Sequence, residues 1–212
     1  MDANVDKRVQ RTKALIREAL VSLIEDKGFD ALTVRDIATR AKINRGTFYL
    51  HYRDKFDLLD QTLAELIAGV QEILLGIARL PAAEVAGGQG LLTAATKLFA
   101  YFQSNARLMR AILATKGSQA FQDQVKQAMW HNIFEKKLIT LIKRENLLVP
   151  PEYLISYLAG AHAGLLREWL ERGCPEAPEE MARILIHLSL RGPMAAAGLA
   201  APGLAAGHDK PP

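Results

Sequence analysis

Residues 33–55, TVRDIATRAKINRGTFYLHYRDK, decide the fold because they place two short helices and a tight turn within 23 residues. Thr33 can cap the first helix, predicted over 34–41, with Asp36 three positions later as in a capping box. Asn44 can cap a second helix, predicted over 45–51, which at about two turns is too short to be stable alone. This spacing is that of a helix-turn-helix, which buries its first helix and presents the second to a DNA groove.

Apolar residues recur at intervals of three and four through most of the chain, which predicts an all-α protein. A helix is expected over 7–27, ending at Gly28, with a buried stripe of Val9, Ile16, Leu20, Leu23 and Ile24. Asp54 is expected to cap a long helix over 54–79. Its apolar stripe comprises Phe56, Leu59, Leu63, Leu66, Ile67, Val70 and Leu74.

The clearest break in the pattern is LPAAEVAGGQG, residues 80–90, which predicts a loop. Further helices are predicted over 91–104, 106–115, 119–146, 152–172 and 178–191. The predicted organisation is a three-helix helix-turn-helix domain over 7–55, a bridging helix over 54–79, a helical domain over 80–192 and a flexible tail over 193–212. The tail prediction rests on a composition of Ala, Gly and Pro with few core-forming residues.

Positive charge is concentrated around the helix-turn-helix pattern. Residues 7–55 carry 12 Lys/Arg and 6 Asp/Glu, a balance of +6, so the rest of the chain sums to −2 within the total of +4. This distribution suits a surface that meets phosphate. The single cysteine excludes an internal disulfide. The charged N-terminus is unlike a secretory signal, so a soluble, cytoplasmic protein with no membrane partner is expected.

The run from 9 to about 74 resembles the DNA-binding domain of the TetR/AcrR family of transcription regulators. Its most specific part is GTFYLHYRDKFDLL, residues 46–59. The resemblance implies a homodimeric, ligand-responsive regulator, most often a repressor, that binds a double-stranded, roughly palindromic DNA operator. Each subunit would place the helix over 45–51 in a major groove, and a ligand in the C-terminal helices would change the spacing of the two DNA-binding domains.

Several side chains in this region suit DNA contact. Arg45 is the best candidate for reading a base, since a guanidinium can pair with two acceptors of guanine, although a phosphate or solvent contact remains an alternative. The resemblance matches Tyr49 and His51 to phosphate contacts, and Lys55 is expected to bind phosphate at a helix start. The full candidate set is Thr33, Arg35, Arg45, Gly46, Thr47, Tyr49, His51 and Lys55.

Residues 153–173 and the following PEEMARIL resemble the paired last helices through which many family members dimerise. Gly160 and Gly164, flanked by alanines, would let another helix approach closely. Packing within the chain is the alternative. The candidate interface residues are Gly160, Gly164, Trp169, Ile184 and Leu188.

Aromatic and Met residues of the C-terminal half could line an apolar pocket for a small, mostly apolar effector, with histidines as polar handles. Such residues at helical spacing are usually ordinary core. The candidate set is Phe102, Met109, Trp130, His131, Phe134, Tyr157 and His162.

Motifs of enzymes are missing: the chain has no phosphate loop, no nucleophile elbow and no metal-ligand spacing of His and Cys. No catalytic activity, cofactor or metal is therefore expected. Two other interpretations stay open. One is a DNA-binding scaffold or division-control factor that responds to a protein partner; the other is a helical interaction module that does not bind DNA.

Overall fold

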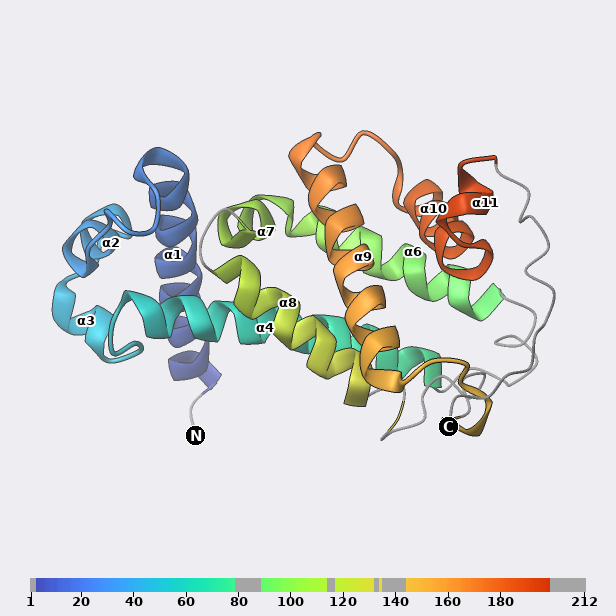
Figure 1. Ribbon diagram of the computed structural model, residues 1–212. Coiled ribbons are helices and arrows are strands. Elements are labelled where there is room, and N and C mark those ends of the chain that lie inside the picture. The colour runs from blue at the N-terminus through green and yellow to red at the C-terminus, as the bar shows by residue number, and fades with distance from the viewer. Residues whose placement is uncertain (1–2, 79–88, 114–116, 132–133, 135–143, 199–212) are drawn as a thin grey trace. The chain divides into compact units, whose positions relative to one another are not determined.

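The computed structural model describes residues 3–78, 89–113, 117–131, 134 and 144–198 (Figure 1). All regular structure in these ranges is helical, which confirms the all-α prediction. The helices are α1 (Ala3–Lys27), α2 (Val34–Arg40), α3 (Arg45–Tyr49), α4 (Lys55–Ala78), α6 (Gln89–Ser104), α7 (Ala106–Leu113), α8 (Gly117–Trp130), α9 (Pro151–Glu171), α10 (Pro178–Arg191) and α11 (Pro193–Ala196). A 3-10 turn covers Arg144–Asn146.

The chain divides into two compact units. The first comprises residues 1–68 and 106–121, and the second comprises residues 69–105 and 122–212. The division crosses the predicted domain limits, because α7 packs with α1 in the first unit. That the helix over 54–79 bridges a DNA-binding domain and a C-terminal domain stays a prediction.

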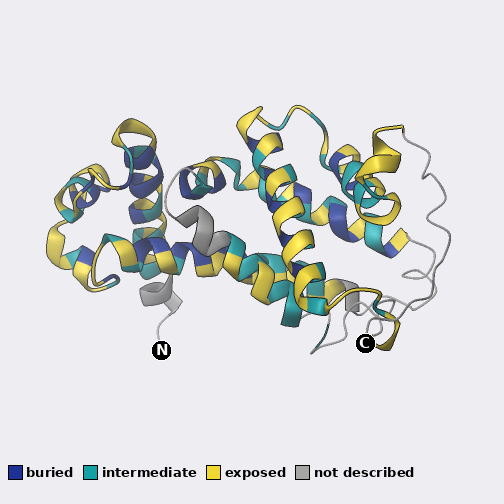
Figure 2. Ribbon diagram, viewed as in Figure 1, coloured by how far each residue is buried: buried dark blue, intermediate teal, exposed yellow. Residues whose placement is uncertain are grey.

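The core of the first unit is built from the apolar faces of five helices (Figure 2). Its fully buried side chains come from α1, α2, α3, α4 and α7, and they include Ile16, Leu20, Ile37, Phe48, Leu58, Leu63, Met109 and Ile112. Four of the five residues predicted for the first helix's stripe are buried, and Val9 is half-buried. The short helices α2 and α3 are thus held by what they pack against, as helices of their length require.

The predicted stripe of α4 needs one correction. Phe56 is 57% exposed, while Leu58, which the prediction omitted, is fully buried. The Phe56 ring lies edge-on to Phe29 at 5.4 Å instead of entering the core. Both residues are in the first turn of α4, where the periodicity alone did not fix which one faces inward. Farther along, Val70 and Leu74 are half-buried.

In the second unit, α6 packs extensively against α10, and α9 also contacts α10. The rings of Phe99 on α6 and Trp169 on α9 meet edge to face at 5.2 Å. Gly69 on α4 lies under Tyr101 of α6, and a Cβ atom at Gly69 would be 2.5 Å from the tyrosine Cζ. That glycine therefore permits a close approach of α4 and α6.

Several C-terminal predictions differ from the structure or fall outside it. The single helix predicted over 119–146 differs at its end, where 144–146 form a 3-10 turn; α8 covers Gly117–Trp130, residues 131 and 134 are helical, and 132–133 and 135–143 lie outside the described residues. Residues 80–88 of the predicted loop and the tail beyond 198 lie outside the described residues, while 89 and 90, predicted as loop, are the first residues of α6. Pro193–Ala196 form a helical turn rather than tail, because Gly192, at φ 84°, ends α10 and proline suits a first helical position. Among the described residues, no helix is long and apolar enough to cross a membrane.

Candidate nucleic-acid interface

The start of α2 is fixed by the predicted capping box. The Thr33 hydroxyl accepts a hydrogen bond from the Asp36 amide at 3.2 Å, and the Asp36 carboxylate accepts one from the Thr33 amide at 2.8 Å. Lys27 at the end of α1 adds an ion pair to the same carboxylate at 2.7 Å. The Lys27 hydrogen bond is the main reason that the pKa of Asp36 falls to about 2. The capping box thus stabilises the start of α2, and the ion pair with Lys27 links α2 to α1.

The start of α3 is fixed by Asn44. Its side-chain oxygen accepts hydrogen bonds from the Thr47 amide at 2.7 Å and from the Thr47 hydroxyl at 3.1 Å. A Cβ at Gly46 would lie 3.2 Å from that oxygen, which is a tight contact. This glycine, one of the candidate DNA-contact residues, therefore leaves room for the cap of its own helix.

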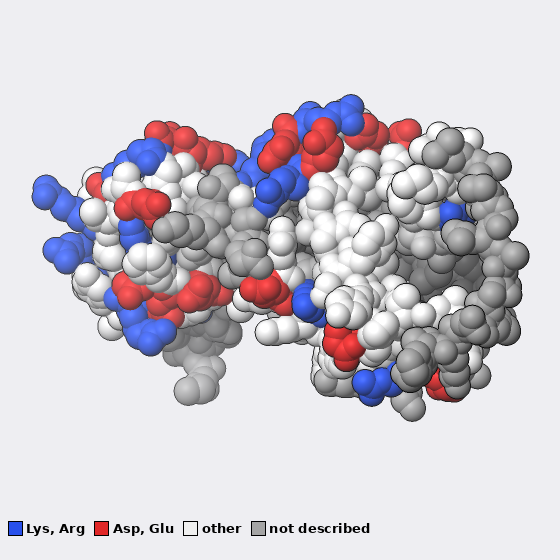
Figure 3. Space-filling view, in the orientation of Figure 1, with Lys and Arg blue, Asp and Glu red and all other residues white. Residues whose placement is uncertain are grey.

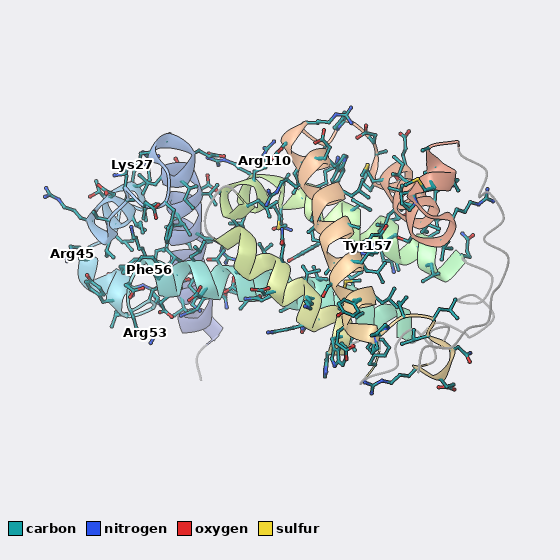
Figure 4. The ribbon with its side chains drawn as sticks, in the orientation of Figure 1. Lys27, Arg45, Arg53, Phe56, Arg110 and Tyr157 are labelled. Carbon is teal, nitrogen blue, oxygen red and sulfur yellow. The ribbon has the colours of Figure 1, made fainter. Side chains whose placement is uncertain are left out.

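Arg45 and Tyr49 form an exposed pair one turn apart on α3. The guanidinium donates a hydrogen bond to the tyrosine hydroxyl at 3.2 Å and lies 5.8 Å from the centre of its ring. Figure 4 labels Arg45 at the outer edge of α3, and both residues are exposed. The ring restricts the orientations of the guanidinium, which reduces the entropy lost when it pairs with an acceptor.

The opposite side of α3 is anchored in the core. Phe48 is fully buried, and its ring lies 5.7 Å from that of Tyr52. Tyr52 is itself buried, and this burial raises the pKa of its hydroxyl. His51 is half-buried beside Tyr52. The candidates Thr33 and Arg35 are exposed at the start of α2.

Lys55 has a different environment from the one predicted. Its ammonium donates hydrogen bonds to the backbone carbonyls of Phe29, Asp30 and Leu32 at 3.1, 2.9 and 2.9 Å. An ammonium has three hydrogens to donate, and all three are used here. The geometry therefore favours a bond to the protein's own backbone over the predicted contact with phosphate.

Two exposed residues next to α3 were missing from the predicted set. Leu50, the C-cap of α3, is 81% exposed, and the side chain of Arg53 is 85% exposed. Leu50 could have been found from its place two residues after the buried Phe48, on the opposite side of a short helix. Figure 3 shows Lys and Arg side chains projecting at the end of the first unit that carries α2 and α3. This end combines positive charge with an exposed apolar group.

Family models match both parts of the chain. Residues 16–62 match the model described as "Bacterial regulatory proteins, tetR family", and residues 91–190 match "Transcriptional regulator C-terminal region". The chain belongs to the TetR family of transcriptional regulators. It is a DNA-binding regulator with an N-terminal helix-turn-helix domain and a C-terminal helical domain, as the sequence resemblance predicted.

Individual TetR-family relatives resemble the chain to different extents. An uncharacterized HTH-type transcriptional regulator of Bacillus subtilis, YxbF, is 32% identical over 65 residues, which make up 31% of this chain and 17% of that protein. The chain therefore spans about a sixth of the length of this curated relative. A putative TetR-family regulator from Syntrophomonas wolfei has a TM-score of 0.62 at 19% identity, covering 91% of this chain and 98% of that one.

Two further solved structures share the fold at low identity. The fatty acid degradation regulator FadR from Bacillus halodurans has a TM-score of 0.59 at 15% identity, covering 84% of this chain and 93% of its own. FadR from Bacillus subtilis, solved with stearoyl-CoA, has a TM-score of 0.59 at 16% identity, and the match covers 84% of this chain and 98% of that one. At these identities the likeness establishes the TetR-family fold alone.

Three of the predicted effector residues, Trp130, His131 and Phe134, lie close together. Trp130 and His131 line an open depression of about 510 Å³ together with Asp123, Lys126 and Gln127. Next to it, the Phe134 ring lies 5.0 Å from that of Trp130, and the Arg144 guanidinium lies 5.9 Å from both rings.

The other predicted effector residues have separate surroundings. Met109 is fully buried in the core of the first unit, Phe102 is half-buried on α6 and Tyr157 is exposed on α9. His162 is within 3.2 Å of the Ser189 hydroxyl on α10, and burial lowers the pKa of its imidazole.

The predicted dimer residues divide into surface and core. Gly160 and Gly164 are exposed on α9, and a Cβ at either would meet nothing within 4 Å in the part of the chain that the structure describes. Ile184 and Leu188 on α10 are half-buried. Trp169 is only 1% exposed, and its indole N–H donates to the Glu176 carbonyl at 3.1 Å. Trp169 therefore belongs to the core of its own subunit and not to a surface that a second subunit could contact.

Proposed function

We propose that this TetR-family protein is a homodimeric repressor that binds a roughly palindromic operator and responds to a small effector. The observation that carries the operator proposal is the exposed Arg45–Tyr49 pair on a helix whose start is capped and whose other side is buried. Such a helix holds its polar side chains in fixed positions for the major groove, where arginine can pair with both acceptors of guanine.

Contacts with the phosphate backbone of the DNA come from side chains around this pair. Thr33 and Arg35 are exposed at the start of α2, and Thr47 and His51 flank the exposed tyrosine. Hydroxyl, guanidinium and imidazole groups all donate to phosphate oxygens, and such contacts set the register of the protein on the duplex. Gly46 keeps the backbone of α3 free of a side chain at its first turn.

A second subunit is proposed to bind through α9 and α10. The support is that Gly160 and Gly164 are exposed on α9 and that Ile184 and Leu188 on α10 are only half-buried. A two-fold pair of subunits would carry two copies of α3, and these require two half-sites about one helical turn apart or a multiple of that spacing.

The effector is proposed to be small and mostly apolar, as the aromatic side chains Trp130 and Phe134 suggest, with an acidic group that Arg144 could pair with. A related protein, FadR of Bacillus subtilis, was solved with stearoyl-CoA, which joins a long apolar chain to anionic groups. A 100-fold loss of operator affinity would need about 2.7 kcal/mol of preference of the effector for the non-binding conformation.

Selection of bound sequences from a random pool of DNA duplexes tests the operator. We expect enrichment of inverted half-sites, and loss of that enrichment for Arg45→Ala. Lys97→Ala, which removes an exposed positive charge on α6, is the matched control and should select the same sequences. A pool that shows no enriched sequence for the parent protein would refute specific operator recognition.

A thermal-shift screen of apolar carboxylates and acyl-CoA compounds, followed by operator titration with each hit, tests the effector. We expect at least one hit to weaken operator binding, and Arg144→Met to reduce that effect without changing binding in its absence. If no hit changes operator affinity, the interpretation as a DNA-binding scaffold that answers to a protein partner takes its place.

A further inference from the structure

Lys55, the first residue of α4, joins that helix to the connection between α1 and α2. This connection follows Gly28, whose φ of 77° ends α1. Its carbonyls at Phe29, Asp30 and Leu32 converge on one ammonium at 2.9–3.1 Å. Backbone carbonyls in a partly buried turn need a donor, and a compact ammonium with three hydrogens can serve three acceptors at once.

Two aromatic rings enclose the same ammonium. It lies 5.0 Å from the centre of the Phe29 ring and 5.3 Å from that of Phe56. The two rings contact each other edge to face at 5.4 Å. This explains why Phe56 stays outside the core, since it covers the lysine. Ring faces attract a cation, so the pair adds to the three hydrogen bonds.

The start of α4 is already capped by a carboxylate from within the chain. Asp54 accepts hydrogen bonds from the amides of Phe56 and Asp57 at 2.9 and 2.8 Å. The amide of Arg53 donates to Asp57 at 2.8 Å. A phosphate at this helix start would meet the Asp54 carboxylate, which makes a DNA contact there unfavourable.

The bond to Leu32 leads directly to the DNA-facing helices. Leu32 directly precedes Thr33, the cap of α2. At the other end of α2, the Ile43 amide donates a hydrogen bond to the Ala38 carbonyl at 3.0 Å, which connects α2 to the turn before α3. Loss of the lysine would free the connection and, with it, the start of α2. The position of α3 relative to α4 would then be less well defined.

We propose that Lys55 is a positioning residue of the DNA-binding domain. It fixes the connection over 29–32 to the start of α4, and so places α2 and α3 for the operator, without contacting DNA itself. This inference rests on the proposed operator binding.

The test compares Lys55→Met with Arg35→Met, which removes an equal charge from an exposed position on α2. Affinities for operator and for random duplex are measured over a range of salt concentrations, below the unfolding temperature of each variant. Lys55→Met should lose at least tenfold in preference for operator over random DNA and keep the parent's salt dependence. Arg35→Met should keep the preference and lower the slope of log affinity against log salt by about 0.9, as for one lost phosphate contact.

Two results for Lys55→Met would overturn the proposal. A slope lowered by about 0.9 with the preference kept would identify a phosphate contact. Unchanged affinity and preference with a lower unfolding temperature would limit Lys55 to stability. If the parent itself shows no preference for any duplex, the proposed function fails rather than this inference.

Lys55→Arg provides a second variant that keeps the charge in case the Met variant fails to fold. The planar guanidinium can contact phosphate, but it cannot direct three hydrogens to carbonyls that surround one point. We therefore expect Lys55→Arg to lose operator preference and to show faster amide hydrogen exchange over residues 29–33. Binding and exchange equal to those of the parent would refute the positioning role.

Discussion

Single side chains determine how the two short helices α2 and α3 begin. Thr33 caps α2, Asn44 caps α3, and Phe48 anchors α3 in the core. Each cap satisfies backbone amides that a helix start leaves without partners. Arg45 and Tyr49 can then project from a helix that has little freedom to move, which is what base recognition requires.

At Arg45, truncation to Ala should reduce discrimination at a guanine of the operator by about 1–3 kcal/mol, because a bidentate contact is lost. Tyr49→Phe keeps the ring and removes only the hydroxyl that Arg45 donates to. This variant should therefore lose less discrimination at the same base than Arg45→Ala does. Competition between operators that differ at single positions measures both effects. Equal discrimination by the parent and Arg45→Ala at every position would show that Arg45 reads no base.

The capping box at Asp36 should make stability depend on pH. Its pKa is about 2 in the folded protein and 3.8 in a model peptide, so its stabilisation is complete above about pH 4 and is lost as pH falls from 3.8 towards 2. Urea unfolding of the parent and of Asp36→Asn from pH 2 to 6 should give curves that converge in this window. Lys27→Met removes the largest cause of the shift, so it should raise the folded pKa of Asp36 towards 3.8 and narrow the window from its low-pH side.

At the level of elements, α7 is attached to α1 by two kinds of contact. Arg107 pairs with Glu18 and with Glu25, the latter at 2.8 Å, and these pairs raise the pKa of the guanidinium further. Met109 and Ile112 on the other face of α7 are fully buried. The ion pairs are largely exposed and screened by solvent, so burial should dominate the attachment.

Replacing Met109 with Ala should therefore cost about 2–5 kcal/mol of unfolding free energy, as for a buried methionine that leaves a cavity. Arg107→Ala should cause a much smaller loss, which disappears at high salt. Urea unfolding at low and high salt measures both variants. A larger loss for Arg107→Ala than for Met109→Ala would show that the ion pairs hold α7. The stability effect would also explain any change in effector response of Met109→Ala.

For the whole molecule, the proposed function depends on assembly through a face that the single chain leaves open. Among the described residues, Gly160 and Gly164 have no neighbour within 4 Å of an added Cβ. Tyr157, labelled in Figure 4, lies on the same helix and is exposed. Glycine in a helix interior costs about 1 kcal/mol relative to alanine. Close approach of a second α9 would offset that cost.

Gly164→Glu should therefore give a folded monomer, because its side chain meets open space in the subunit but brings charge into the proposed interface. Sedimentation should show the monomer, and operator affinity should fall because the two half-sites are no longer bound together. Thr93→Glu, at an exposed position on α6, is the matched control and should remain a dimer. A dimeric Gly164→Glu protein with the parent's operator affinity would exclude this face.

Local rules in the sequence were enough to predict the helix-turn-helix. The caps at Thr33 and Asn44 act over three residues, the burial of Phe48 follows from helical spacing, and Gly28 and Gly173 end their helices at positive φ. These features depend on neighbours along the chain, so they could be read from the order of residues.

The tertiary structure alone decided the role of residues whose partners are far apart in the sequence. Lys55 meets carbonyls 23 to 26 residues away, which replaces the predicted phosphate with the protein's own backbone. Trp169 turns to Phe99, and Met109 enters the core beside α1. Periodicity tells which face of a helix is apolar, but the packing of the other helices determines what covers that face.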